Sequence, residues 1–161
     1  MRIVVADTSP IRYLVVIGEI EILPALFGTV IIPTVVRDEL SHPRAPEAVR
    51  TWMQAPPLWL EPRVTPASPF DGALENLDAG ERAALVLAAS LSAELILLDD
   101  REGARVALEK GFGVMGTLRV LQLAAKRGLL DWDDAVARLK RTNFRYQQAV
   151  IDRLLDEPGS E

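Results

Sequence analysis

The residues best suited to chemistry in this chain are four acidic side chains spread along its length. Asp7 directly follows the apolar run RIVVA, and Asp99 directly follows the apolar run LILL. Glu39 lies near the end of PTVVRDEL, and Glu81 lies within LDAGERAAL. Because sites in parallel α/β sheets lie outside the carboxyl ends of the strands, we expect Asp7 and Asp99 at one crevice.

Two of these acids also have a simple structural interpretation. Asp7 fits a turn or the N-cap of a helix that begins in DTSP, where Ser9 could equally provide the cap. Asp78 followed three residues later by Glu81 fits a capping box, which would account for Glu81 without any chemistry. Position alone therefore leaves both roles open for Asp7 and for Glu81.

Glu39 gives a stronger indication of function, because of its helix face. It follows Val35 by four residues and Val36 by three, so it shares their apolar face, whereas Asp38 points more easily to water. A glutamate on a core face is costly unless it is paired with a cation or a metal. The alternative is a side chain at the helix end that reaches outward to solvent.

Four carboxylates in one crevice would need a counter-charge to stay ionised. Hard divalent cations with oxygen ligands, Mg²⁺ or Mn²⁺, are the natural solution. Such an ion lowers the pKa of water and stabilises charge on an attacked phosphate. The acids therefore predict a metal-dependent phosphodiester hydrolase.

The composition bounds what else the chain can be. It has 161 residues, enough for one domain with a real core, no cysteine, and a single histidine, His42. A disulfide framework, a thiolate nucleophile and a multi-histidine metal site within one chain are excluded. The net charge of −5 argues against a broad basic footprint for nucleic acid, although not against a local one. No apolar run predicts a signal peptide or a membrane span, so we expect a cytoplasmic protein without membrane contact.

Two groups of basic residues could supply a local nucleic-acid contact, although a solvated helix face is the simpler interpretation of each. The group expected near the crevice is Arg12, Arg37, Arg101 and Arg105. The other group is Lys126, Arg127, Arg138, Lys140, Arg141 and Arg145.

Apolar runs alternate with helical patterns along the chain, which predicts an α/β fold with a mostly parallel, helix-covered sheet of about five strands. Strands are expected over 2–6, 28–32, 58–60 (an edge strand between prolines), 95–98 and 112–115. Helices are expected over 11–17, 33–40, 45–53, 78–93, 105–110, 118–126, 133–141 and 147–155. A loop is expected over 65–77. We expect a single domain over 1–161, with 130–161 as a C-terminal helical extension packed on it.

The order and spacing of the acids resemble a known family. Five stretches spanning residues 3–130 look like a PIN domain, close to the branch of VapC-like toxins of bacterial and archaeal toxin–antitoxin modules: VVADTSPIRYL, IIPTVVRDEL, LDAGERAALVLAA, LILLDDREGARVA and GVMGTLRVLQLAAKRGLL. Each motif is weak alone, and the five together in this order are a strong signal. The resemblance implies a three-layer α/β/α PIN fold and an endoribonuclease that depends on Mg²⁺ or Mn²⁺.

The resemblance also assigns roles to individual residues. Asp7, Glu39, Glu81 and Asp99 match the family's acidic positions, so they are the expected catalytic set. Asp7, Glu81 and Asp99 are the expected metal ligands, with Glu39 orienting or deprotonating the attacking water or helping to hold a second metal. The expected supporting residues are Ser9, Asp100 and Thr117.

One departure from the family pattern leaves a choice open. Many PIN nucleases have Thr at the end of the fourth strand and the acid one or two residues later, whereas this chain has Asp99 and Asp100 in succession. Asp99 is the expected ligand, and Asp100 is expected to cap the next helix or to support the site.

The resemblance further implies partners. These are a single-stranded or structured RNA substrate, a small antitoxin protein that blocks the site, and a second copy of the chain in a homodimer. The main alternative is a catalytically silent PIN-like binding module that acts only through protein partners. A phospho-acceptor domain is a weaker alternative, because Met115-Gly116-Thr117 lacks the expected Lys.

Overall fold

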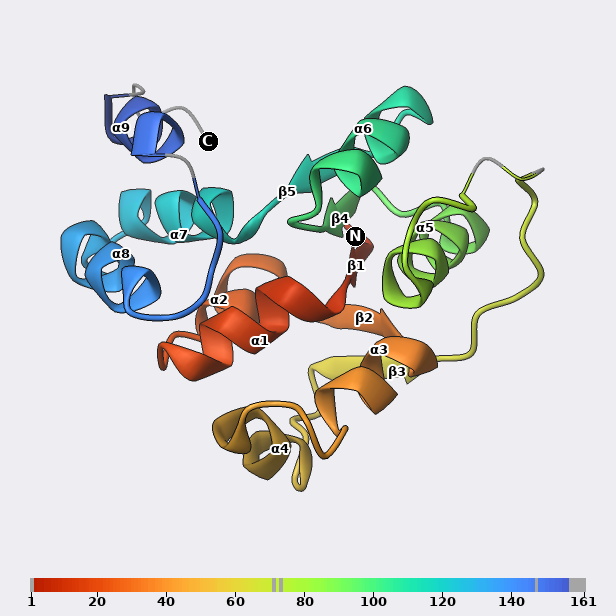
Figure 1. The fold of residues 1–161 in the computed structure, drawn as a ribbon, viewed down its shortest axis with the longest axis horizontal. Helices are drawn as coiled ribbons and strands as arrows, with labels where there is room; N and C mark the ends of the chain where they lie inside the picture. The colour runs from red at the N-terminus through yellow and green to blue at the C-terminus, as the bar shows by residue number, and fades with distance from the viewer. Residues whose placement is uncertain (1, 71, 73, 147, 157–161) are drawn as a thin grey trace.

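Five short strands form a parallel sheet at the centre of the computed structural model, which describes residues 2–70, 72, 74–146 and 148–156. The strand order is β3-β2-β1-β4-β5, and every neighbouring pair is parallel (Figure 1). The strands are β1 (Val4–Ala6), β2 (Val30–Pro33), β3 (Leu60–Arg63), β4 (Leu95–Leu97) and β5 (Gly113–Met115). Strands β2 and β3 lie on one side of β1, and β4 and β5 lie on its other side, so the strand order switches at β1 and the ends of β1 and β4 adjoin the same crevice.

Helices cover both faces of this sheet. In the described residues they are α1 (Thr8–Val16), α2 (Ile22–Phe27), α3 (Thr34–Leu40), α4 (Glu47–Met53), α5 (Ala79–Leu91), α6 (Arg101–Glu109), α7 (Thr117–Lys126), α8 (Trp132–Lys140) and α9 (Gln148–Asp156). Helices α5 and α6 lie on one face, and α1, α2 and α7 lie on the other, with α8 and α9 packed outside (Figure 1). Helix α3 contacts both α1 and α5 and so spans the two layers at one end of the sheet.

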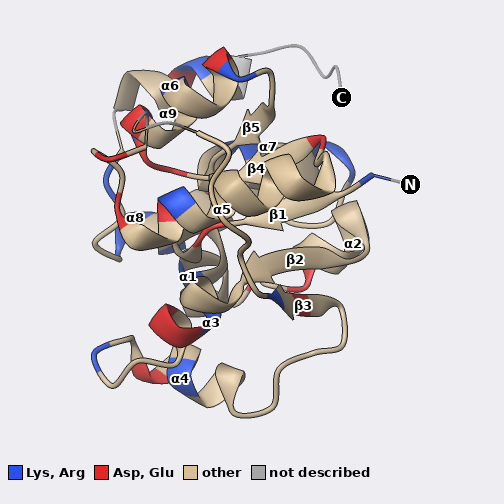
Figure 2. Cartoon of the chain, turned by 90° about the vertical axis from the view of Figure 1, so that its right-hand side faces the viewer, with Lys and Arg blue, Asp and Glu red and all other residues tan. Residues whose placement is uncertain are grey.

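The two-residue period of the strands sorts the core into these layers. Val4 and Ala6 pack in one cluster with Ile11 of α1, whereas Val5 packs in a second cluster with Leu85 of α5. All five side chains are fully buried. The charged residues lie on the helices, the loops and the edge strand β3, while β1, β2, β4 and β5 carry none (Figure 2). The prediction of a three-layer α/β/α fold with about five strands is therefore confirmed, and the sheet is entirely parallel.

Several element boundaries differ from those expected. Pro33 ends β2 and is the N-cap of α3, rather than the first residue of the helix. Helix α6 begins at Arg101, four residues early, because Asp100 caps it with a hydrogen bond from the backbone N–H of Gly103. Helix α1 likewise begins at Thr8, with Pro10 in its first turn, where proline leaves no hydrogen bond unmade.

The edge strand begins later than expected, and one helix was not expected at all. Leu60 pairs with Val30 and is buried, whereas Leu58 is fully exposed, so the strand starts at Leu60. Pro62 lies within β3, which is possible because β3 is an edge strand. Helix α2 occupies Ile22–Phe27, where no element was predicted. The expected start of the last helix at residue 147 and the end of the chain at 157–161 lie outside the described residues.

Among the described residues, no helix is long and apolar enough to cross a membrane.

Candidate active site

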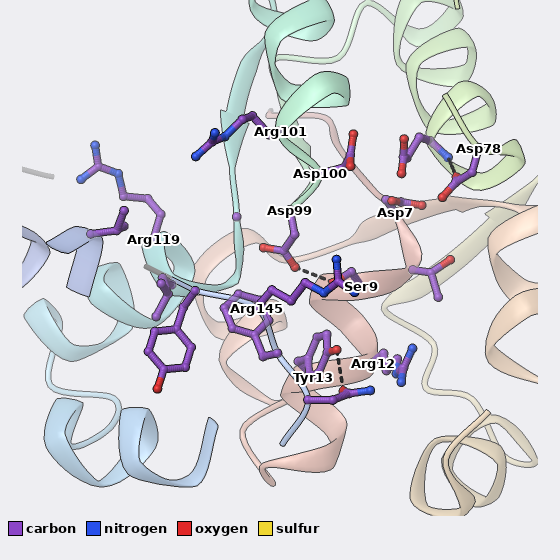
Figure 3. Close-up of a pocket in the computed structure, with 18 of the residues that line it drawn as sticks. Asp7, Ser9, Arg12, Tyr13, Asp78, Asp99, Asp100, Arg101, Arg119 and Arg145 are labelled. Carbon is purple, nitrogen blue, oxygen red and sulfur yellow. Dashed lines mark hydrogen bonds between the residues drawn. The ribbon is translucent and has the colours of Figure 1, made fainter. Parts of the chain in front are cut away.

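An open cleft of about 1010 Å³ lies at the carboxyl ends of β1 and β4. Six carboxylates line it, from the ends of two strands and from the ends of three helices: Asp7, Glu39, Asp78, Glu81, Asp99 and Asp100. All four acids of the expected catalytic set are therefore brought to one cavity, although they are separated by as many as 92 positions in the chain. Figure 3 shows this cleft.

Asp7 is the most deeply buried acid of the cleft, with 6% of its surface exposed. Its backbone N–H bonds to the carbonyl of Leu97, which continues the pairing of β1 with β4 and fixes the position of Asp7. Asp7 is the N-cap residue of α1, as its sequence position suggested, but its side chain does not make the capping hydrogen bond. Burial, and after it the charges of Asp78, Glu39 and Asp99, raises the pKa of Asp7 to about 7, despite the opposing effect of the Thr8 N–H.

Glu39 approaches Asp7 from α3. The hydroxyl of Thr8 donates a hydrogen bond to Glu39 Oε2 and so fixes this carboxylate to the first turn of α1. Glu39 is half-buried, whereas Asp38 is exposed and pairs with Arg37. The predicted difference between the two faces of this helix is therefore confirmed.

Gly80 makes room for Asp7 and Glu39 together. A Cβ at Gly80 would lie 2.9 Å from Asp7 Oδ1 and 3.0 Å from both carboxylate oxygens of Glu39. Two carboxylates, one from the end of β1 and one from α3, thus converge on the same position of α5, where a glycine leaves the space open. Any side chain there would push them apart.

Glu81 enters the cleft from the start of α5. Asp78 is the N-cap and accepts a hydrogen bond of 2.9 Å from the Glu81 N–H, so the prediction of Asp78 as the cap is confirmed. The Glu81 side chain is nonetheless in the cleft and only 8% exposed. Burial, a hydrogen bond with Asp78 and the charges of Asp78, Asp100 and Asp7 raise its pKa well above the usual range. The cap and the cleft are compatible roles for this segment.

Asp99 is held by three donors at the end of β4. Its Oδ1 accepts from the backbone N–H of Thr117 at 2.6 Å, and its Oδ2 accepts from the hydroxyls of Ser9 and Thr117, each at 2.7 Å. Thr117 is fully buried. A Cβ at Gly116 would lie 2.8 Å from Asp99 Oδ1, so this carboxylate also abuts a glycine. Ser9 and Thr117, the two polar residues expected to support the site, both bind Asp99.

Asp100 lines the same cleft but has a different contact. Its Oδ2 accepts a hydrogen bond of 2.8 Å from Gly103 N–H, and the residue is exposed. Asp100 is thus the N-cap of α6, as expected, and Asp99 is the acid locked into the wall of the cleft. In Figure 3, Asp99 lies between Asp7 and Arg119.

The donor set fits a hard divalent cation. The protein ligands would all be carboxylate oxygens. Asp7 and Glu81 are buried and have raised pKa values, and a nearby cation would lower both pKa values. Among the described residues, no three His, Asp or Glu side chains already form a cage around one point. The cleft therefore offers carboxylates around a cavity rather than a closed coordination shell.

Several residues of the site were not expected from the sequence. Thr8 lines the cleft and Gly80 lies behind Asp7 and Glu39, and neither was predicted, although a glycine inside the strong helix pattern of DAGERAAL is an anomaly that indicates a close approach. Of the basic residues expected near the crevice, Arg12 and Arg101 line it, whereas Arg37 and Arg105 pair with acids of their own helices. Of the second basic group, only Arg145 lines the cleft, and Arg119 and Arg153 line it without having been expected.

The fold and the site define a class: an α/β protein with carboxylates gathered at the carboxyl ends of its central parallel strands. A family model described as a PIN domain matches residues 3–160, and the chain belongs to the PIN-domain family. Proteins of this family are generally nucleases and typically use divalent metal ions. No curated protein and no solved structure gave a significant match to the chain.

Proposed function

We propose that this chain is an endoribonuclease that depends on Mg²⁺ or Mn²⁺. The observation that carries the proposal is the burial of Asp7 beside Glu39 in a cleft lined by six carboxylates. This burial raises the pKa of Asp7 to about 7. Such an arrangement destabilises the chain unless a cation binds there. Membership of a family of nucleases supports phosphodiester hydrolysis as the chemistry.

The proposed roles follow from the contacts of each acid. Asp7 and Asp99 would hold the cation, with Glu81 as a direct or water-bridged ligand. Glu39, bound by the Thr8 hydroxyl and beside Asp7 at Gly80, would orient or deprotonate the attacking water, or help to hold a second cation. Ser9 and Thr117 fix the two oxygens of Asp99, which limits its rotation. When bound, the divalent ion lowers the pKa of water and neutralises negative charge on the phosphate.

A toxin of a toxin–antitoxin pair is the cellular role we propose, on the resemblance to VapC-like proteins. A small antitoxin that blocks the cleft and a homodimer belong to the same proposal, as does a location in the cytoplasm.

Cleavage of a labelled single-stranded RNA by the purified chain, in Mg²⁺ or Mn²⁺ and in EDTA, tests the activity. We expect cleavage only with the metal. Asp7→Asn and Asp99→Asn should each reduce the rate by at least about 100-fold, because each removes a charged ligand. Asp38→Asn is the matched control, since Asp38 is an exposed acid that does not line the cleft.

Full cleavage by folded Asp7→Asn and Asp99→Asn variants would contradict the assignment of the site. A chain that binds a partner protein, but neither cleaves RNA nor binds Mn²⁺ in calorimetry, would instead support the silent binding module.

A further inference from the structure

The segment after α8 forms one side of the cleft and carries cations and an aromatic ring. We call Phe144, Arg145, Tyr146 and Arg153 the C-terminal wall; all four line the same cavity as the carboxylates. Helix α9, which carries Arg153, packs on α7, outside the sheet and its α1 layer (Figure 1). The wall therefore faces the acids from a part of the chain that supplies none of them.

The wall is anchored on both sides. The ring of Phe144 packs edge-on against that of Tyr13, with 5.0 Å between centroids and 77° between planes, and the Tyr13 hydroxyl donates to Asn143 Oδ1 at 2.7 Å. The buried amide of Gln122 in α7 donates to the carbonyl of Leu154 at 2.8 Å. These contacts hold the wall in place before any ligand arrives.

In the part of the chain that the structure describes, the arginines of the C-terminal wall do not pair with the acids of the cleft. Arg2, Arg37, Arg63, Arg105 and Arg138 form ion pairs with acids, and none of these five arginines lines the cleft. Arg145 and Arg153 line it, are exposed, and have no carboxylate partner among the described residues, although six acids share the cavity. In the view of Figure 3, Arg145 extends towards Ser9 and Asp99, and Arg101 and Arg119 lie on the side of Asp99 away from Asp7.

An exposed aromatic ring completes this surface. Tyr146 is 40% exposed, and Lys140 Nζ lies 5.7 Å from its ring centroid. Cations that contact a backbone, next to a ring on which a base can stack, are the means by which proteins hold single-stranded nucleic acid. A chain with a net charge of −5 needs such a local surface to hold a polyanion.

We propose that the C-terminal wall is the substrate-binding surface of the cleft: Arg145 and Arg153 contact phosphates of a single RNA strand, and Tyr146 stacks on one of its bases. This inference rests on the proposed function and names the residues that deliver RNA to the acids. In this proposal the wall binds the RNA, and the acids of the cleft carry out the chemistry.

Fluorescence anisotropy of a labelled single-stranded oligouridine in EDTA tests the wall without any catalysis. The double variant Arg145→Ala/Arg153→Ala should weaken binding at low salt by at least tenfold. The slope of log K against log salt should fall by about 1.4, since each phosphate contact on a single strand contributes about 0.7. Arg141→Ala is the matched control, because Arg141 is an exposed arginine four residues before Arg145 that does not line the cleft.

The stacking role has its own pair of variants. Tyr146→Ala should weaken binding by at least about fivefold, whereas Tyr146→Phe, which keeps the ring, should bind as the wild type does. In metal-activated cleavage, the arginine variant should show a raised KM with little change in kcat, because the acids are untouched.

The proposal is overturned if the double arginine variant binds RNA no more weakly than Arg141→Ala. It is also overturned if the wild-type chain binds no RNA, which would leave the wall to an acidic protein partner. Because binding is measured in EDTA, loss of binding in the variants supports the wall even if the wild-type chain cleaves nothing, so the two proposals fail separately.

Discussion

Asp7 combines deep burial with three neighbouring carboxylates, and this combination has measurable consequences. The folded chain holds the pKa of Asp7 near 7, against an ordinary value of 3.8. Between pH 3.8 and about pH 7, Asp7 is therefore protonated in the folded state and ionised in the unfolded state. Without a cation, the stabilisation from this group is complete below about pH 4 and is lost as the pH rises through 7.

This linkage predicts that Asp7→Asn stabilises the metal-free chain. Ionising Asp7 in the folded state costs roughly 4 kcal/mol at pH 8, from a shift of about three pKa units. We expect Asp7→Asn to raise the free energy of unfolding in EDTA by roughly 2–4 kcal/mol at pH 8 and by less at pH 5. Urea denaturation at both pH values measures this, with Asp38→Asn as the control. A variant less stable than the wild type at pH 8 would contradict the account.

Metal binding should depend on pH for the same reason. A cation must displace the proton of Asp7, and that of Glu81 where Glu81 binds directly, so we expect the apparent affinity for Mn²⁺ to weaken by at least about tenfold for each pH unit below 7. Calorimetric titration of Mn²⁺ at pH 6 and pH 8 measures the ratio. Equal affinities at both pH values would show that Asp7 is not among the ligands.

Part of this picture could be predicted from single residues. Apolar runs ending at Asp7 and Asp99 placed both acids at strand ends, and helix periodicity separated Glu39 from Asp38. Capping rules identified Asp78 and Asp100 as caps. What could not be predicted is which atoms meet, because the contacts of Asp99 with Ser9 and Thr117 span 90 and 18 positions of the chain and depend on the packing of three elements.

At the scale of elements, the start of α5 is where the carboxylates of Asp7 and Glu39 come together. Gly80 is in its first turn, between the cap Asp78 and Glu81, and it leaves the space into which Asp7 and Glu39 both extend. A glycine at that position lowers helix stability relative to alanine. Its presence is accounted for by the two carboxylates rather than by the helix.

Gly80→Ala therefore tests the packing of the acids. A methyl group within 3.0 Å of three carboxylate oxygens must displace Asp7, Glu39 or both. We expect at least a tenfold loss of Mn²⁺ affinity and of cleavage, with the fold retained. Gly103→Ala is the matched control, since Gly103 is in the first turn of α6 and its Cβ would meet Leu98. Equal, small effects of both variants would contradict the role given to Gly80.

Physical reasons explain why helix α2 and the position of helix α9 were not predicted from the sequence. Helix α2 is six residues long and contains Pro24, so its helical pattern is too short to be distinct. Helix α9 was expected, but its place beside the cleft was not, because it depends on the burial of Ile151 and Leu154 in the core and on the hydrogen bond from Gln122 to the Leu154 carbonyl. The C-terminal wall follows from that placement, which periodicity does not encode.

At the scale of the whole molecule, charges are distributed so that an acidic chain can hold RNA. The net charge is −5, and several arginines outside the cleft are neutralised by ion pairs with acids. The arginines of the C-terminal wall have no carboxylate partner among the described residues, so they can contact a ligand. Binding should therefore be local and sensitive to salt.

If the chain is a toxin, its expression in a bacterial host should arrest growth. Asp7→Asn should abolish the arrest while the protein accumulates, because only the chemistry is lost. Co-expression of a small protein encoded beside the gene should restore growth with the wild-type chain. Arrest by Asp7→Asn equal to that by the wild type would separate any toxicity from the cleft.

The central claim is that the carboxylates of the cleft bind a divalent cation. Anomalous diffraction from crystals soaked in Mn²⁺ tests it most directly. We expect an anomalous peak in the cleft within ligand distance of Asp7 and of at least one of Glu81 and Asp99, and no such peak in crystals of Asp7→Asn. A well-ordered cleft with no peak beside Asp7, at a Mn²⁺ concentration and pH that support cleavage, would contradict the account.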